Sequence, residues 1–163
     1  MFQISKSLPH GAQALEIGSH VGSSAPFICA GLNDNNGHLF CVDTSMNQTM
    51  PDVARNAHRE FVRNTKEYSS LITPIIKKSK DLEFEDIGYH LDFVFIDADR
   101  GEDAVRSDFY TLMDWVKAGG LVAFHDISAW FPGINIVMGE ALASGTWQIC
   151  GLAGSLAWIR RVG

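Results

Sequence analysis

The sequence has few cysteines, and their arrangement excludes a disulfide-stapled secreted domain. It contains three, Cys29, Cys41 and Cys150, which are far apart and include no C-x-x-C pair. An odd, scattered set of this kind provides neither a disulfide framework nor a zinc motif. We therefore expect three small buried thiols in a reducing compartment, the cytoplasm.

Long apolar runs and long basic runs are also missing. No stretch approaches the roughly 18 apolar residues that span a bilayer, and the first residues, MFQISKSLPHG, lack the apolar segment of a secretory signal. The formal net charge is −6, and the basic clusters at 77–80 and 160–161 are short. A membrane partner is not expected, and nucleic acid is not favoured because an extended nucleic-acid footprint needs a basic surface.

The residues that are present describe one globular domain over residues 1–163. With 46% hydrophobic and 20% charged residues, the chain is long enough to bury a core. It shows no repeat, low-complexity tract or linker that would mark a second domain. Apolar segments alternate with amphipathic ones, an order that predicts an α/β fold with a mostly parallel sheet.

This alternation predicts the individual strands and helices. Strands are expected at 14–17, 38–42, 70–76, 91–96, 120–124, 146–150 and 155–160. Helices are expected at 24–32, 52–68, 81–87, 103–117 and 133–144, the fourth ending in the glycines of KAGG. The last two strands are joined by CGLAG, which is too short for a crossover helix, so they must pair antiparallel.

The segment EIGSHVGSSA, residues 16–25, carries two glycines where the first strand turns into its helix. Ligands bind at this end of a doubly wound sheet, and Gly18 and Gly22 would let backbone approach one, although an ordinary tight turn would use the same glycines. Asp43 follows the second strand, where an acid can accept both hydroxyls of a ribose. The G-x-x-x-G spacing disfavours a dinucleotide, and Glu16 suits a cationic group better than a pyrophosphate.

Together these motifs resemble those of the class I S-adenosylmethionine-dependent methyltransferases. EIGSHVGSSA is similar to their glycine motif, CVD to their ribose acid, and KKSKDL to a segment whose serine lies by the adenine. FIDADRGED, at 95–103, is similar to stretches of the catechol and caffeoyl-CoA O-methyltransferases and of methyltransferase family 24. AFHDI, at 123–127, is typical of family 24.

The resemblance implies a Rossmann-like fold and S-adenosylmethionine as the cofactor. The fold would be a doubly wound, mostly parallel seven-stranded sheet in the order 3-2-1-4-5-7-6 with an antiparallel last strand. Glu16 would lie near the cationic end of the cofactor, Asp43 would take the ribose, and Ser79 would lie near the adenine. The cofactor-binding residues implied are Glu16, Gly18, Ser19, His20, Gly22, Ser23, Asp43, Thr44, Ser79 and Asp97.

The chemistry is expected where the fourth and fifth strands end. The O-methyltransferases named above hold a divalent cation there with an Asp and an Asp-Asn pair, and a Lys helps to deprotonate the hydroxyl. Asp97 matches the first Asp, Arg100 the Lys, and His125 with Asp126 the pair, which makes these four the catalytic candidates. Asp97 and Asp126 are the better ligands for Mg²⁺ or another divalent cation. Arg100 stays protonated and cannot be a base, whereas His125 can act as a base or a ligand.

The resemblance favours O-methylation of a small-molecule hydroxyl, on a sugar, a catechol-like compound or a natural product. Two alternatives stay open: an N- or macromolecule-directed methyltransferase, and a cofactor-binding module without turnover, suggested by the replacement at Arg100. Trp130 and Phe131 either wall the acceptor pocket or seal the edge of the core. Because about a dozen residues precede the first strand, we expect an acceptor pocket that is open, or completed by a second copy of the chain or by further sequence.

Overall fold

The computed structural model describes residues 1–44 and 57–163. Its strands are β1 (Gln13–Ile17), β2 (His38–Val42), β3 (Ile72–Ile75), β4 (Leu91–Ile96), β5 (Val116–Phe124), β6 (Trp147–Ala153) and β7 (Leu156–Arg161). Its α-helices are α1 (Phe2–Lys6), α2 (Ala25–Asn33), α3 (Ala57–Asn64), α4 (Glu102–Leu112) and α5 (Pro132–Ala143). Short 3₁₀ helices are η1 (Lys66–Leu71), η2 (Ser79–Asp81), η3 (Phe84–Asp86) and η4 (Met113–Trp115).

The strands form a single sheet in the order β3-β2-β1-β4-β5-β7-β6, which confirms the predicted topology. β1 pairs parallel with β2 on one side and with β4 on the other. β7 runs antiparallel to both β5 and β6. The antiparallel pairing of β6 with β7 was predicted from CGLAG, but residues 150–153 of that segment belong to β6, and only residues 154–155 connect the two strands. The carboxyl ends of β1, β2, β3, β4 and β5 therefore lie along the same edge of the sheet.

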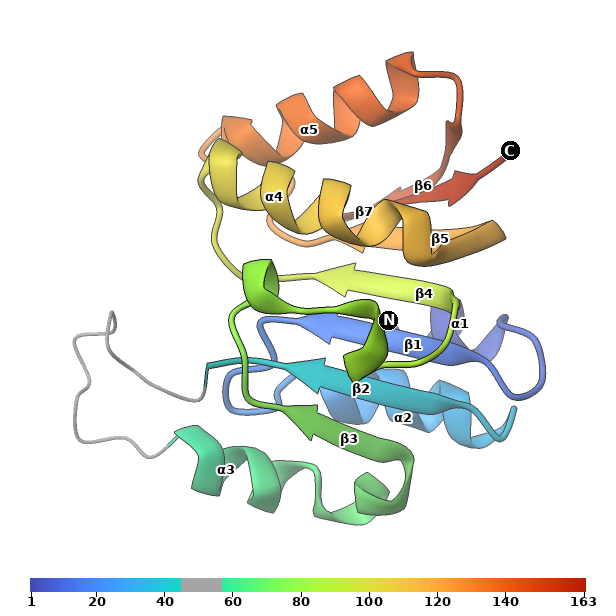
Figure 1. Ribbon diagram of the computed structural model, residues 1–163, viewed down its shortest axis with the longest axis vertical. Coiled ribbons are helices and arrows are strands. Elements are labelled where there is room, and N and C mark those ends of the chain that lie inside the picture. The colour runs from blue at the N-terminus through green and yellow to red at the C-terminus, as the bar shows by residue number, and fades with distance from the viewer. Residues whose placement is uncertain (45–56) are drawn as a thin grey trace.

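Helices cover the sheet on both faces, with α4 in front of it and α1 and α2 behind it in Figure 1. β4 is buried at every position because it lies in the middle of this sandwich. Val94 packs in the cluster that contains Phe109 of α4, whereas Phe93 packs with Ile28 of α2. The alternation of side chains along each strand thus supplies two cores and holds the strand ends in fixed positions.

Several predicted elements differ from the structure. The helix expected at 81–87 is replaced by η2 and η3, and the helix expected at 103–117 ends at Leu112. The KAGG segment lies inside β5, whose Val116 already pairs with Leu91 of β4. The beginning of the helix expected at 52–68 lies outside the described residues.

The cysteine prediction is confirmed at two positions and wrong at the third. Cys29 and Cys41 are buried, whereas Cys150 is exposed on β6. The sheet edge explains this difference, because β6 is the last strand and most of its side chains face solvent. Within the described residues, no helix has the length and hydropathy needed to cross a membrane.

Candidate active site

The turn that follows β1 depends on two glycines in left-handed backbone conformations. Gly18 has φ +88° and Gly22 has φ +71°. A Cβ on Gly18 would overlap the carbonyl of Asp97 and lie 2.8 Å from the Cα of Ala98, and a Cβ on Gly22 would lie 2.9 Å from the Cγ2 of Thr65. Both glycines are therefore required by the packing of the protein against itself, whether or not a ligand approaches them.

Glu16 lies beneath this turn with none of its surface exposed. Its carboxylate accepts hydrogen bonds from the Ser24 hydroxyl at the start of α2 and from the Cys41 thiol. Burial raises the pKa of Glu16, and the hydrogen bonds from Ser24 and Cys41 oppose that shift. Glu16 ties β1 to α2 and is not among the described residues that line the neighbouring cavity. The expectation that Glu16 lies near the cationic end of the cofactor stays a prediction.

A cavity of about 520 Å³ opens at the carboxyl ends of β1, β2 and β4. Gly18 forms part of its wall, as do Asp43 and Thr44 after β2 and Ser79 after β3. The structure thus brings these four residues together, and their contact with a cofactor stays a prediction. The carboxylate of Asp43 accepts a hydrogen bond of 3.0 Å from the backbone N–H of His20. This bond joins the first turn to the end of the second strand.

The other residues predicted from the glycine motif lie in the turn but are not among the described cavity-lining residues. Ser19 is buried and Ser23 is exposed. His20 is partly buried and has φ +44°, an uncommon conformation for a residue with a side chain. Its backbone N–H donates to Asp43, and the predicted contact of His20 with the cofactor stays a prediction.

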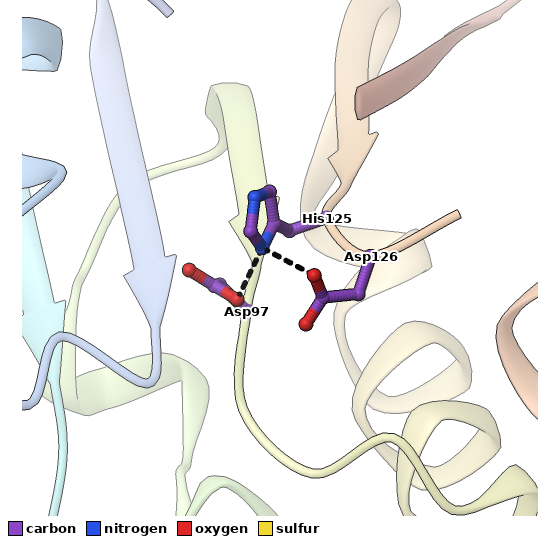
Figure 2. A group of neighbouring side chains, drawn as sticks. All are labelled: Asp97, His125 and Asp126. Atoms are coloured by element: carbon purple, nitrogen blue, oxygen red, sulfur yellow. Dashed lines mark hydrogen bonds and ion pairs between the residues drawn. The ribbon is translucent and has the colours of Figure 1, made fainter. Parts of the chain in front are cut away.

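Figure 2 shows three polar side chains that converge where β4 and β5 end. The Nδ1 atom of His125 lies 3.0 Å from Oδ1 of Asp97 and 3.3 Å from Oδ1 of Asp126. One ligand atom from each residue lies within 4.8 Å of the other two. The parallel pairing of Ile96 with Phe124 explains this meeting, because the residues that follow leave the sheet at the same edge. The predicted convergence of Asp97 and Asp126 is confirmed.

The charges of this cluster are partly balanced by Arg100. Its Nε donates a hydrogen bond of 2.5 Å to Oδ2 of Asp126, and its guanidinium lies 5.4 Å from the centroid of the Phe131 ring. Burial raises the pKa of Asp97, and the imidazole of His125 opposes that shift. Asp126 has φ +59°, a strained conformation of the kind that gathers at functional sites.

The two aromatic residues after β5, Trp130 and Phe131, differ in their burial. Phe131 packs against the core and against Arg100, whereas Trp130 is 88% exposed and does not cover the core formed by the described residues. Asp108 of α4 also lines the cavity, and the sequence reasoning missed it. A signal was present, because Asp108 shares helical spacing with Val105 and Leu112 and is an acid on an otherwise apolar face.

The family model of a methyltransferase domain, Methyltransf_24, matches residues 15–127. This range begins in β1 and includes the glycine turn, Asp43, Asp97 and the pair His125 and Asp126. No curated protein matches the chain by sequence.

Solved structures share the fold at low sequence identity. An rRNA methylase from Streptococcus thermophilus has a TM-score of 0.71 at 9% identity and covers 98% of this chain and 92% of its own. The O-methyltransferase NovP has a TM-score of 0.72 at 16% identity, covering 98% and 75%. Fibrillarin from Aeropyrum pernix, solved with S-adenosyl-L-methionine, has a TM-score of 0.65 at 14% identity, covering 93% and 67%. Since the family model matches most of the sequence, this chain belongs to the methyltransferase-domain family and is a class I S-adenosylmethionine-dependent methyltransferase.

Proposed function

We propose that this chain transfers the methyl group of S-adenosylmethionine to a hydroxyl oxygen of a small-molecule acceptor. The observation that carries this proposal is the convergence of Asp97, His125 and Asp126 beside the cavity. The sulfonium already activates the methyl group, so the protein must align the acceptor and help it to lose a proton. The cluster supplies groups suited to the second task, which a hydroxyl acceptor needs.

The cofactor would extend along the strand edge from this cluster into the cavity. Asp97 immediately precedes Ala98, which lines the cavity, so the reacting methyl group belongs at this end. Asp43 has the position of an acid that accepts the ribose hydroxyls, and Gly18 would meet the methionine portion. Fibrillarin, which has the same fold, was solved with bound S-adenosyl-L-methionine, and this supports the choice of cofactor.

The cluster also fits a divalent cation. Ligands of one octahedral ion with bonds of about 2.1 Å lie about 3 Å apart, and Nδ1 of His125 lies 3.0 Å and 3.3 Å from its two carboxylate neighbours. Asp97, Asp126 and His125 would hold the ion. When bound, such an ion lowers the pKa of a hydroxyl that coordinates it. The two carboxylates suit Mg²⁺ or Mn²⁺, whereas the imidazole suits a later transition-metal ion such as Fe²⁺ or Zn²⁺.

The chain's own residues offer a second way to remove the acceptor proton. If Nδ1 of His125 donates to Asp97, its Nε2 is the basic nitrogen and can take a proton from the hydroxyl. Asp97 then orients the imidazole, as a carboxylate does in a catalytic triad. Arg100 neutralises Asp126 and can stabilise the acceptor oxyanion, but it cannot accept the proton.

Methylation of RNA is the second candidate. The rRNA methylase from Streptococcus thermophilus has this fold over 98% of the present chain. Lys77, Lys78 and Lys80 line the cavity, where they could contact a phosphate. The net charge of −6 argues against a broad nucleic-acid surface and keeps the small-molecule acceptor first.

A panel of acceptors separates these candidates. The protein would be incubated with methyl-labelled S-adenosylmethionine and with catechols, sugars, amines and RNA, and the labelled product identified by mass spectrometry. We expect label on the oxygen of a small molecule, and Asp97→Asn should reduce it strongly. Label in RNA or on nitrogen would favour the alternatives. A protein that binds S-adenosylhomocysteine in calorimetry but labels nothing in the panel would favour a binding module.

A further inference from the structure

Asp108 is a buried carboxyl in the cavity wall that the chemistry above does not use. It lies on α4, it is 4% exposed, and it shares the buried face of that helix with Val105, Phe109 and Leu112. Those three side chains pack into the core, whereas Asp108 borders the cavity. An acid in such a position is costly unless polar groups meet it, so its surroundings should contain hydrogen-bond donors.

The protein supplies Asp108 with few of the hydrogen bonds that a carboxyl can accept. Burial raises its pKa, the hydroxyl of Ser79 opposes that shift by hydrogen bonding, and the nearby charge of Asp99 adds to it. No lysine or arginine in the described part of the chain forms an ion pair with it. A carboxylate has about four acceptor sites, so Asp108 can accept further hydrogen bonds from a ligand in the cavity.

The part of the cofactor that would face Asp108 follows from the arrangement of the cavity and rests on the proposed function. The methyl group belongs beside Asp97, and the ribose belongs at Asp43, nearer the sheet edge formed by β3. The adenine extends beyond the ribose and would enter the space between residues 77–80 and α4. Asp108 and Ser79 line this space, and adenine carries a hydrogen-bond donor there, its 6-amino group.

We propose that Asp108 accepts a hydrogen bond from the 6-amino group of adenine and thereby selects an adenosyl cofactor. Asp108 is then a specificity-determining residue in the cofactor site and takes no part in proton removal. Ser79 lines the same cavity as Asp108, so both side chains border the space that the adenine would enter. If Asp108 only supported Ser79, the protein would not distinguish adenine from a purine that lacks the 6-amino group. The relative affinity for two such ligands therefore tests the proposal.

Calorimetry with two ligands tests the assignment. The ligands are S-adenosylhomocysteine and its analogue with purine in place of adenine, which lacks only the 6-amino group. The affinity of the wild-type protein for S-adenosylhomocysteine should exceed its affinity for the analogue by about ten- to a hundredfold. This is the contribution of one hydrogen bond to a charged group. Asp108→Ala should bind the two ligands alike, and Asp108→Asn should keep a preference because its amide oxygen still accepts.

A matched control and a second variant make each outcome decisive. Asp103→Ala removes an exposed acid of the same helix and the same cavity, and it should keep the wild-type preference. Asp108→Leu repeats the test if Asp108→Ala does not fold. The assignment would be overturned if these variants lost the same factor in affinity for both ligands. It would also be overturned if the wild type bound both ligands with equal affinity. Failure of the wild type to bind S-adenosylhomocysteine would instead overturn the proposed function.

Discussion

The carboxylate of Asp126 is shared between Arg100 and His125. Its Oδ2 lies 2.5 Å from Nε of Arg100, while its Oδ1 lies 3.3 Å from Nδ1 of His125. A permanent cation is thus bound to one of the two acids that would hold a divalent ion. We therefore expect Arg100 to weaken the binding of a cation by the cluster, because its charge would repel an ion and its fork occupies an oxygen ligand.

The first prediction concerns this competition. Arg100→Met should raise the affinity for Mn²⁺ by about tenfold, since one unit charge near the site is removed and Asp126 is released. The affinity can be measured from the electron paramagnetic resonance signal of free Mn²⁺. Arg106→Met is the control, because Arg106 pairs with Glu102 and Glu140 outside the cluster. Equal Mn²⁺ affinities in wild type and Arg100→Met would show that Arg100 does not compete.

The second prediction concerns the glycine turn. Gly18→Ala should destabilise the protein by more than about 2 kcal/mol, because it adds a clash with the backbone of Asp97 to the strain of a positive φ. Gly88→Ala isolates the strain, because Gly88 has φ +71° and open space around its Cα. Urea unfolding of both variants measures the difference. Similar losses in the two would mean that the close approach to Asp97 carries no cost.

The third prediction concerns Asp43. Asp43→Ala should weaken the binding of S-adenosylhomocysteine by about ten- to a hundredfold while the protein stays folded. Asp43→Asn keeps one acceptor oxygen and should lose less. Calorimetry gives the affinities, and circular dichroism shows whether the fold persists. An unchanged affinity in folded Asp43→Ala would contradict the proposed placement of the ribose.

The fourth prediction concerns the pH dependence of stability and Glu16. Burial raises its pKa in the folded protein above the ordinary value of 4.5. When the pH lies above 4.5 but below the pKa of the folded state, the folded protein keeps a proton on Glu16 that the unfolded protein releases. The free energy of unfolding therefore falls as the pH rises through this range. Glu16→Gln lacks this loss, and its stability relative to wild type should be higher at pH 7 than at pH 4. Urea unfolding at both values tests this, and an equal difference at each pH would contradict it.

Much of the fold could be predicted because strand periodicity and connection length are local properties. LDFVFI indicates a strand buried on both faces, and CGLAG forces an antiparallel hairpin. The short helix α1 was missed because five residues do not complete the repeat that marks an amphipathic helix. KAGG looks like a helix end, yet tertiary pairing of Val116 with Leu91 starts the strand earlier.

The convergence of acids at the strand ends could be predicted from the sequence, but the contacts around them could not. The acids at the strand ends follow from topology, which is why Asp97 and Asp126 could be expected to meet. The burial of Glu16 beneath the turn depends on Ser24 and Cys41, which come from α2 and β2. The position of Asp108 in the cavity depends on how α4 packs over the sheet. Such relations arise only when distant segments come together.

The most direct measurement is the transfer of a labelled methyl group from S-adenosylmethionine to an accepted hydroxyl by wild type and His125→Ala. His125 stands at the centre of the cluster, in contact with both Asp97 and Asp126. We expect the transfer rate to fall by about a hundredfold or more in the variant, the contribution of a positioned acid–base group, with unchanged affinity for S-adenosylhomocysteine. Full transfer to oxygen by folded His125→Ala would contradict the role of the cluster in removing the acceptor proton.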